Sequence, residues 1–203
     1  MTKALAVALV LTGPLSLVAA GPRTFTVEPD RSRAMIAVGK SGAFSFAGHT
    51  HEVEAPLTSG TVRLDPDTAS RSTVRLEFSA AKLRVTGKGE SPDDVPKVQE
   101  AMIGEQVLDV KKFPTIAFES AGVTAKGAPP SLELTVEGRL TIHGTTRPVT
   151  APVSVRIDGA MLTATGKFLI KQTDFGIKPI SVGGVVKVKD ELTITFNIAA
   201  RER

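Results

Sequence analysis

The sequence has 203 residues, a formal net charge of +4, and no cysteine, tryptophan or tyrosine. Without cysteine the protein has no disulfide bonds, no thiolate metal site and no cysteine nucleophile, so its fold depends on burial alone. Basic residues are scattered among 21 acidic residues, and aromatic residues make up only 4% of the chain. This excludes the clustered basic surface with stacking aromatics that is typical of nucleic-acid-binding proteins.

The first twenty residues predict a cleaved Sec-type signal peptide. Lys3 precedes an apolar run over residues 4–18, and small residues follow up to Ala20, a pattern that signal peptidase recognises. A membrane anchor is the alternative, but it needs about 20 uninterrupted apolar residues, and Gly-Pro interrupts this run. We expect residues 1–20 to be a signal peptide, residues 21–203 to be one domain without a membrane span, and the mature bacterial protein to be periplasmic or secreted.

Alternation of apolar and polar residues dominates the mature chain, as is typical of strands with one buried face. The first predicted strand lies near Arg33–Val38. The alternating apolar positions that follow are Val62, Leu64; Val74, Leu76, Phe78; Ile116, Phe118; Leu132, Leu134, Val136, Leu140, Ile142; Val153, Val155, Ile157; Leu162, Ala164, Phe168, Ile170; and Leu192, Ile194, Phe196, Ile198. Turn signals separate the sets at 65–67 (DPD), 127–130 (GAPP), 143–145 (HGT), 158–159 (DG) and 183–184 (GG). The pattern predicts about eight strands.

One segment departs from the alternation and predicts a helix over about residues 92–107. Ser91 suits the N-cap, and Pro92 suits the first helical position. The two aspartates that follow suit the positive end of the helix dipole. Apolar residues then recur at helical spacing, namely Val95, Val98, Met102 and Ile103. We expect this helix to lie across the outside or one end of the β structure.

Evenly spaced strands with one apolar face predict an all-β fold, either a barrel or a sandwich. We favour an antiparallel barrel because long alternating segments, such as 133–142 and 149–157, are joined by short hairpins. A membrane barrel would carry aromatic girdles on its outer face, and the chain has no Trp or Tyr to form them. We therefore expect a soluble barrel, as a monomer or homodimer, with an apolar interior.

The interior of an eight-stranded barrel is either just filled by side chains or able to hold one small ligand. The inward positions here are mostly aliphatic, so a wide barrel would be under-filled, and an apolar ligand would restore the missing contacts. Composition alone supports equally well a flattened barrel that its own side chains fill completely. The candidate ligand-binding residues of the interior are Val62, Leu76, Phe78, Phe118, Leu134, Ile142, Val155, Phe168 and Phe196.

Three segments resemble motifs of the YceI-like family. Residues 113–120 (FPTIAFES), after the LDV of residues 108–110, are similar to the family's "LD…yPxIxFxS" stretch. Residues 140–149 (LTIHGTTRPV) are similar to its "LTIHGVTK-V" hairpin, and residues 173–177 (TDFGI) to its "DFGI" motif. The motifs stand in the family's order, and the resemblance covers most of residues 24–203.

This resemblance implies an extended, lipocalin-like antiparallel barrel of eight strands, exported to the periplasm. It implies binding, carriage or storage of a long apolar isoprenoid-type lipid, such as a polyprenyl quinone or its precursor, with no cofactor and no enzyme activity. The chain departs from the family pattern at residues 25–30 (FTVEPD) and 88–92 (KGESP). These departures mark a divergent branch of the family.

The histidines carry the alternative function. His49 and His51 are two residues apart, so on a strand both would leave the same face and could share a metal ion, with Glu52 or His143 as a third ligand. A metal-binding or stress-protective envelope protein is therefore the alternative to a lipid-binding one. A third interpretation places His49 and His51 at the barrel mouth, against the polar head of a ligand. The chain has no nucleophile elbow, phosphate loop or zinc-protease motif, so we expect no catalytic residues and no metal site.

Overall fold

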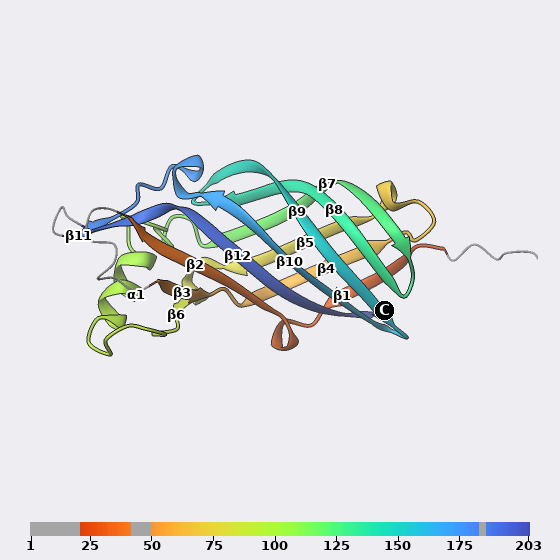
Figure 1. Ribbon diagram of the computed structural model, residues 1–203, viewed down its shortest axis with the longest axis horizontal. Coiled ribbons are helices and arrows are strands. Elements are labelled where there is room, and N and C mark those ends of the chain that lie inside the picture. The colour runs from red at the N-terminus through yellow and green to blue at the C-terminus, as the bar shows by residue number, and fades with distance from the viewer. Residues whose placement is uncertain (1–20, 42–49, 183–185) are drawn as a thin grey trace, which may run out of the picture.

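The computed structural model describes residues 21–41, 50–182 and 186–203, which form an elongated β-barrel with one helix at one end (Figure 1). The strands are β1 (Arg23–Val27), β2 (Arg33–Ser41), β3 (His51–Glu54), β4 (Leu57–Leu64), β5 (Thr73–Ser79), β6 (Arg84–Val85), β7 (Thr115–Ala128), β8 (Ser131–Ile142), β9 (Thr145–Asp158), β10 (Met161–Lys171), β11 (Ser181–Val182) and β12 (Val186–Glu202). The helix is α1 (Val95–Ile103), and short 3-10 turns are η1 (Pro29–Arg31), η3 (Ala69–Arg71), η4 (Ala80–Lys82) and η5 (Gln172–Phe175).

Eight antiparallel strands close the barrel in the order β1-β4-β5-β7-β8-β9-β10-β12, and β12 pairs with β1. This confirms the predicted barrel and excludes the sandwich. Closure occurs where Phe25 of β1 lies opposite both Val62 of β4 and Glu202 of β12. The seam carries an ion pair, because Arg23 donates to both carboxylate oxygens of Glu202, and these hydrogen bonds lower the pKa of Glu202.

The structure has more strand segments than the sequence predicts, because short breaks separate β1 from β2, β3 from β4 and β5 from β6. The segment predicted near Arg33–Val38 is β2, which continues β1 beyond the η1 turn. At this break Ser32 is buried, and its hydroxyl donates to the Glu28 carbonyl and accepts from the Ala199 amide. Strands β2, β3 and β6 extend the wall beyond β12 toward the α1 end. Strands β1, β3 and β6 are so short that the alternation along them does not predict separate strands.

The predicted alternation is confirmed along the long strands. On β8 the odd-numbered residues from Glu133 to Arg139 are exposed, whereas Leu132, Leu134, Val136 and Leu140 are buried. The same pattern runs along β9, whose buried positions end at Ile157. Since successive side chains on a strand point to opposite faces, polar residues cover the outside and aliphatic residues point into the barrel. No helix within the described residues is long and apolar enough to span the hydrocarbon core of a membrane.

The predicted helix is present but shorter than 92–107. Ser91 begins a hydrogen-bonded turn rather than the helix itself, since its carbonyl accepts from the amides of Asp94 and Val95. Asp94 is the N-cap, Pro96 lies in the first turn, and Gly104 ends the helix. The helix lies at one end of the barrel, which is one of the two predicted positions (Figure 1).

The predicted turns within the described residues join the strands as hairpins or loops, while Gly183-Gly184 lies outside the described residues. His143 and Gly144 form the β8–β9 hairpin with positive φ angles of 51° and 68°, as expected for a tight two-residue turn. The His143 ring contacts an aromatic side chain from outside the hairpin. It packs edge-on against Phe113, with ring centroids 4.5 Å apart.

Two phenylalanine rings lie over glycines of a neighbouring strand. A Cβ atom at Gly138 would overlap the Phe118 ring, and a Cβ atom at Gly166 would overlap the Phe196 ring. The missing side chains let both rings lie close to the barrel wall. The glycines therefore help to keep the centre of the barrel open.

We predict that Gly166→Ala destabilises the protein. The added Cβ would meet the Phe196 ring and lie 2.5 Å from the Pro152 carbonyl oxygen, so backbone and ring must both shift, at a cost of roughly 1–3 kcal/mol. Gly122→Ala is the matched control, because its Cβ would have no neighbour closer than 3.6 Å. Thermal unfolding should show a lower midpoint for Gly166→Ala alone; equal midpoints would contradict the role assigned to this glycine.

Candidate functional site: an apolar cavity inside the barrel

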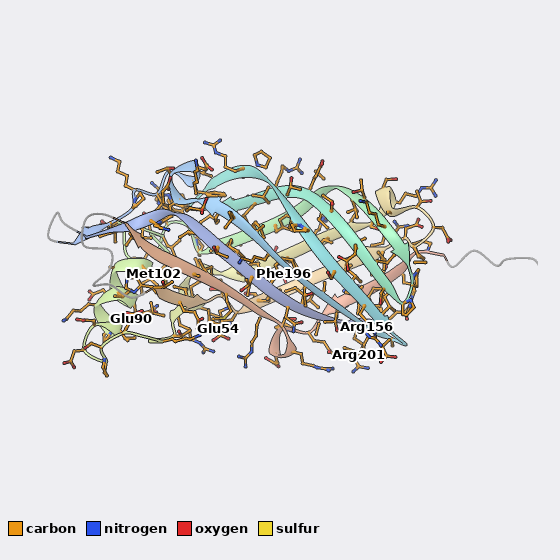
Figure 2. The ribbon with its side chains drawn as sticks, in the orientation of Figure 1. Glu54, Glu90, Met102, Arg156, Phe196 and Arg201 are labelled. Carbon is orange, nitrogen blue, oxygen red and sulfur yellow. The ribbon has the colours of Figure 1, made fainter. Side chains whose placement is uncertain are left out.

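The barrel encloses a cavity of about 720 Å³, a size within the range of small-molecule binding sites. Its wall is formed by side chains from α1 and from the strands β2, β3, β4, β5, β7, β8, β9, β10 and β12. All nine residues predicted to face the interior line it: Val62, Leu76, Phe78, Phe118, Leu134, Ile142, Val155, Phe168 and Phe196. Figure 2 shows Phe196 at mid-length of the barrel. Their direct contact with a ligand stays a prediction.

The end of the cavity remote from α1 is closed by tightly packed side chains. Phe25 and Ala200 are fully buried, and Leu132 and Leu162 are almost so, at 3% and 1% exposed. These residues belong to one cluster with Val27 and Ile157. Arg156 and Arg201 lie at this end of the molecule in Figure 2. We therefore expect a ligand to enter the cavity from the other end.

At that other end α1 lies across the barrel and presents an apolar face to the cavity. Val98 and Met102 line the cavity and pack with Val95 against the cluster of buried residues beneath them. Figure 2 shows Met102 at this end. Gln99 holds the helix to β6, because its amide nitrogen donates to the Leu83 carbonyl at 2.9 Å and its oxygen accepts from the Val85 amide at 2.8 Å.

The TDFGI motif also contributes to the α1 end of the cavity. Phe175 is 1% exposed and Ile177 is 5% exposed, and both line the cavity. The buried Gln172 donates to the Lys189 carbonyl at 2.8 Å. The carboxylate of Asp190 accepts from the Thr173 amide and hydroxyl at 2.9 and 2.7 Å. The motif is thus a fixed turn that closes part of the wall.

Two polar side chains, His51 and Glu90, meet on the cavity wall near α1. His51 begins β3, and its Nδ1 atom lies 2.9 Å from a carboxylate oxygen of Glu90. The structure thus places His51 on the cavity wall, whereas His49 lies outside the described residues. Glu90 was missed by the sequence analysis. The neighbouring glycines Gly87 and Gly89, with φ angles of 76° and 78°, form a tight turn, but such a turn does not by itself indicate that Glu90 is buried.

The metal alternative finds no support in the part of the chain that the structure describes. Within residues 21–41, 50–182 and 186–203, no three His, Cys, Asp or Glu side chains cluster as metal ligands. Glu52, considered as a third ligand, instead contacts Thr86 and Lys88. His143 lies in the β8–β9 hairpin against Phe113. The described site is therefore an apolar cavity with a few polar groups at one end.

Comparison with known proteins decides the family. The family model of the YceI-like domain matches residues 25–200. The chain belongs to the YceI-like family. No curated protein matches the sequence of this YceI-like chain significantly.

Solved structures share the YceI-like fold at low sequence identity. Burkholderia cenocepacia BcnA is 22% identical with a TM-score of 0.66, over 85% of this chain and 98% of that one. A polyisoprenoid binding domain from Saccharophagus degradans, implicated in plant cell wall breakdown, is 10% identical with a TM-score of 0.62, over 88% and 98% of the two chains. The Campylobacter jejuni YCEI protein is 14% identical with a TM-score of 0.52, over 81% and 84%. At these identities the likeness establishes the fold.

We predict that Gln99→Met loosens the helix of this YceI-like barrel. The substitution removes both hydrogen bonds to β6 and leaves the Val85 amide without its partner, at a cost of roughly 1–3 kcal/mol. In this variant amide hydrogen exchange should become faster than in the wild type in α1, and it should stay unchanged in β8. The control is Gln106→Met, since Gln106 is exposed just after the helix; equal exchange in the two variants would show that Gln99 does not hold α1.

Proposed function

We propose that this protein binds a long apolar lipid of the isoprenoid type inside the barrel and carries or stores it without chemical change. The observation that carries the proposal is the cavity of about 720 Å³, whose wall is aliphatic and aromatic over most of its length. We expect a ligand to enter at the α1 end, because packed side chains close the opposite end. The shape suits a chain-like molecule that enters lengthwise.

Burial of the lipid chain supplies the binding energy. Each CH₂ group moved from water into the cavity contributes roughly 0.8 kcal/mol, so one five-carbon isoprene unit contributes about 3–4 kcal/mol before the cost of association. An empty cavity forfeits the dispersion contacts of its lining atoms, and a lipid would restore them. Binding can therefore be tight with few polar contacts.

The comparisons support the class of ligand. The Saccharophagus degradans structure, which shares the fold, is described as a polyisoprenoid binding domain. The same neighbour supports a binding role rather than an enzymatic one, since it is described as a binding domain. We further propose export to the periplasm, on the basis of the signal-peptide pattern in residues 1–20.

Filling the cavity should abolish lipid retention. Ala164 lies in the first half of β10, lines the cavity and packs against the cluster at the closed end, so Ala164→Trp places an indole in the space of the lipid. A tenfold loss of affinity corresponds to displacing only about two CH₂ groups, so we expect retained lipid to fall at least about tenfold. The measurement is native mass spectrometry, with organic extraction, of protein purified from its own bacterium.

Thr165→Trp is the matched control, because Thr165 is the next residue on β10 and is exposed on the outside. It should keep the lipid. Absence of apolar material from both the wild type and this control would contradict the proposed function.

The same spectra give the mass of the chain. We expect the mass of a mature protein that begins at Gly21, whereas a chain that still carries residues 1–20 would contradict export by cleavage.

A further inference from the structure

The polar side chains of the cavity wall gather at the α1 end. Among the described residues that line the cavity, the polar ones are His51, Glu90, Ser91, Asp94, Lys97 and Gln172. Four of these side chains already have polar partners. Asp94 pairs with the exposed Lys97, and Gln172 donates to a backbone carbonyl. The Ser91 hydroxyl accepts from the Asp93 amide. His51 and Glu90 remain.

Glu90 is a buried carboxylate held in a fixed turn. Its side chain is 4% exposed, and its amide donates to the Gly87 carbonyl at 3.1 Å. The preceding residues dock on β3, where the Thr86 amide donates to the Glu52 carbonyl at 2.9 Å. Figure 2 shows Glu90 near α1, close to Met102. The carboxylate thus lies at the α1 end of the cavity.

Neither carboxylate oxygen of Glu90 has a hydrogen-bond partner among the described residues, and neither does Nδ1 of His51. The two groups are 2.9 Å apart, but their approach does not have hydrogen-bond geometry. The contact is therefore a charge interaction only when the imidazole is protonated, and it leaves the acceptor capacity of the carboxylate unused.

An unpartnered buried carboxylate is costly, because the group loses its hydration and gains nothing in return. A donor on a bound molecule would remove that cost. Beyond the α1 end the cavity wall is apolar, so the donor must sit at one end of a ligand whose remainder is hydrocarbon. This arrangement fits a lipid with a small polar head group.

We propose that Glu90 is a specificity-determining residue that accepts a hydrogen bond from a hydroxyl head of the bound lipid. The ligand class is then a polyprenyl alcohol, phenol or hydroquinone, in preference to a quinone, an ether or a phosphate. The inference rests on the proposed lipid-binding function and concerns only which head group the α1 end selects.

The hydrogen-bonding capacities of Glu90 and His51 distinguish these head groups. A carboxylate only accepts hydrogen bonds, so a quinone carbonyl or an ether oxygen has nothing to offer it, and a phosphate adds repulsion between like charges. A hydroxyl both donates and accepts. It can donate to Glu90 and also pair with Nδ1 of His51, whichever tautomer the ring adopts.

The test is calorimetric titration of the delipidated mature protein with three probes of one chain length: geranylgeraniol, its methyl ether and geranylgeranyl phosphate. The wild type should bind the alcohol about tenfold or more tightly than the other two, since a hydrogen bond to a charged group has this magnitude. Glu90→Met, which removes the acceptor, should reduce the preference for alcohol over ether to about one. Glu90→Gln should improve binding of the phosphate.

Glu54→Gln is the matched control, because Glu54 is a carboxylate on β3 whose partner Arg84 lies outside the barrel, and Figure 2 shows it away from Glu90. It should keep the wild-type order of affinities. Equal affinity of the wild type for all three probes, or an unchanged order in Glu90→Met, would overturn the head-group inference and leave lipid binding intact. Failure of all three probes to bind would instead overturn the proposed function itself.

Discussion

A closed barrel of eight strands encloses a width set by its hydrogen bonds, and the inward side chains of this protein do not fill it. Strand number and tilt fix the diameter, whereas the lining is mostly Val, Leu, Ile and Ala. Two of the phenylalanines that line the cavity, Phe118 and Phe196, lie over Gly138 and Gly166 at the wall. The remaining space is the cavity, and the proposed function depends on it.

The two ends of the barrel differ because the strands differ there. At one end β1 and β12 close the seam, and Phe25, Leu162 and Ala200 pack without a gap. At the other end the wall continues as β2, β3 and β6, which leave the ring, and α1 lies across the opening. The asymmetry therefore gives a ligand one direction of entry.

The polar end of the cavity illustrates how stability and specificity oppose each other. The Glu90 carboxylate has no hydrogen bond among the described residues. It therefore lowers the stability of the ligand-free protein relative to an apolar residue of similar shape. The same carboxylate can distinguish ligands that share one hydrocarbon chain, because the chain itself contributes equally to all of them. A protein that only stored apolar material would have no use for this group.

The sequence by itself determined the strand pattern and the direction of the side chains. Alternation with a period of two places Leu134 and Val155 inside the barrel and Glu133 outside, whatever the neighbours are. The tight hairpin at His143-Gly144 is equally local. Only the tertiary structure decided the break between β1 and β2, the early end of α1 at Gly104 and the burial of Glu90. A glutamate between two glycines and a proline has the local features of an exposed loop, and its burial arises only when that loop docks on β3 and α1 covers the cavity.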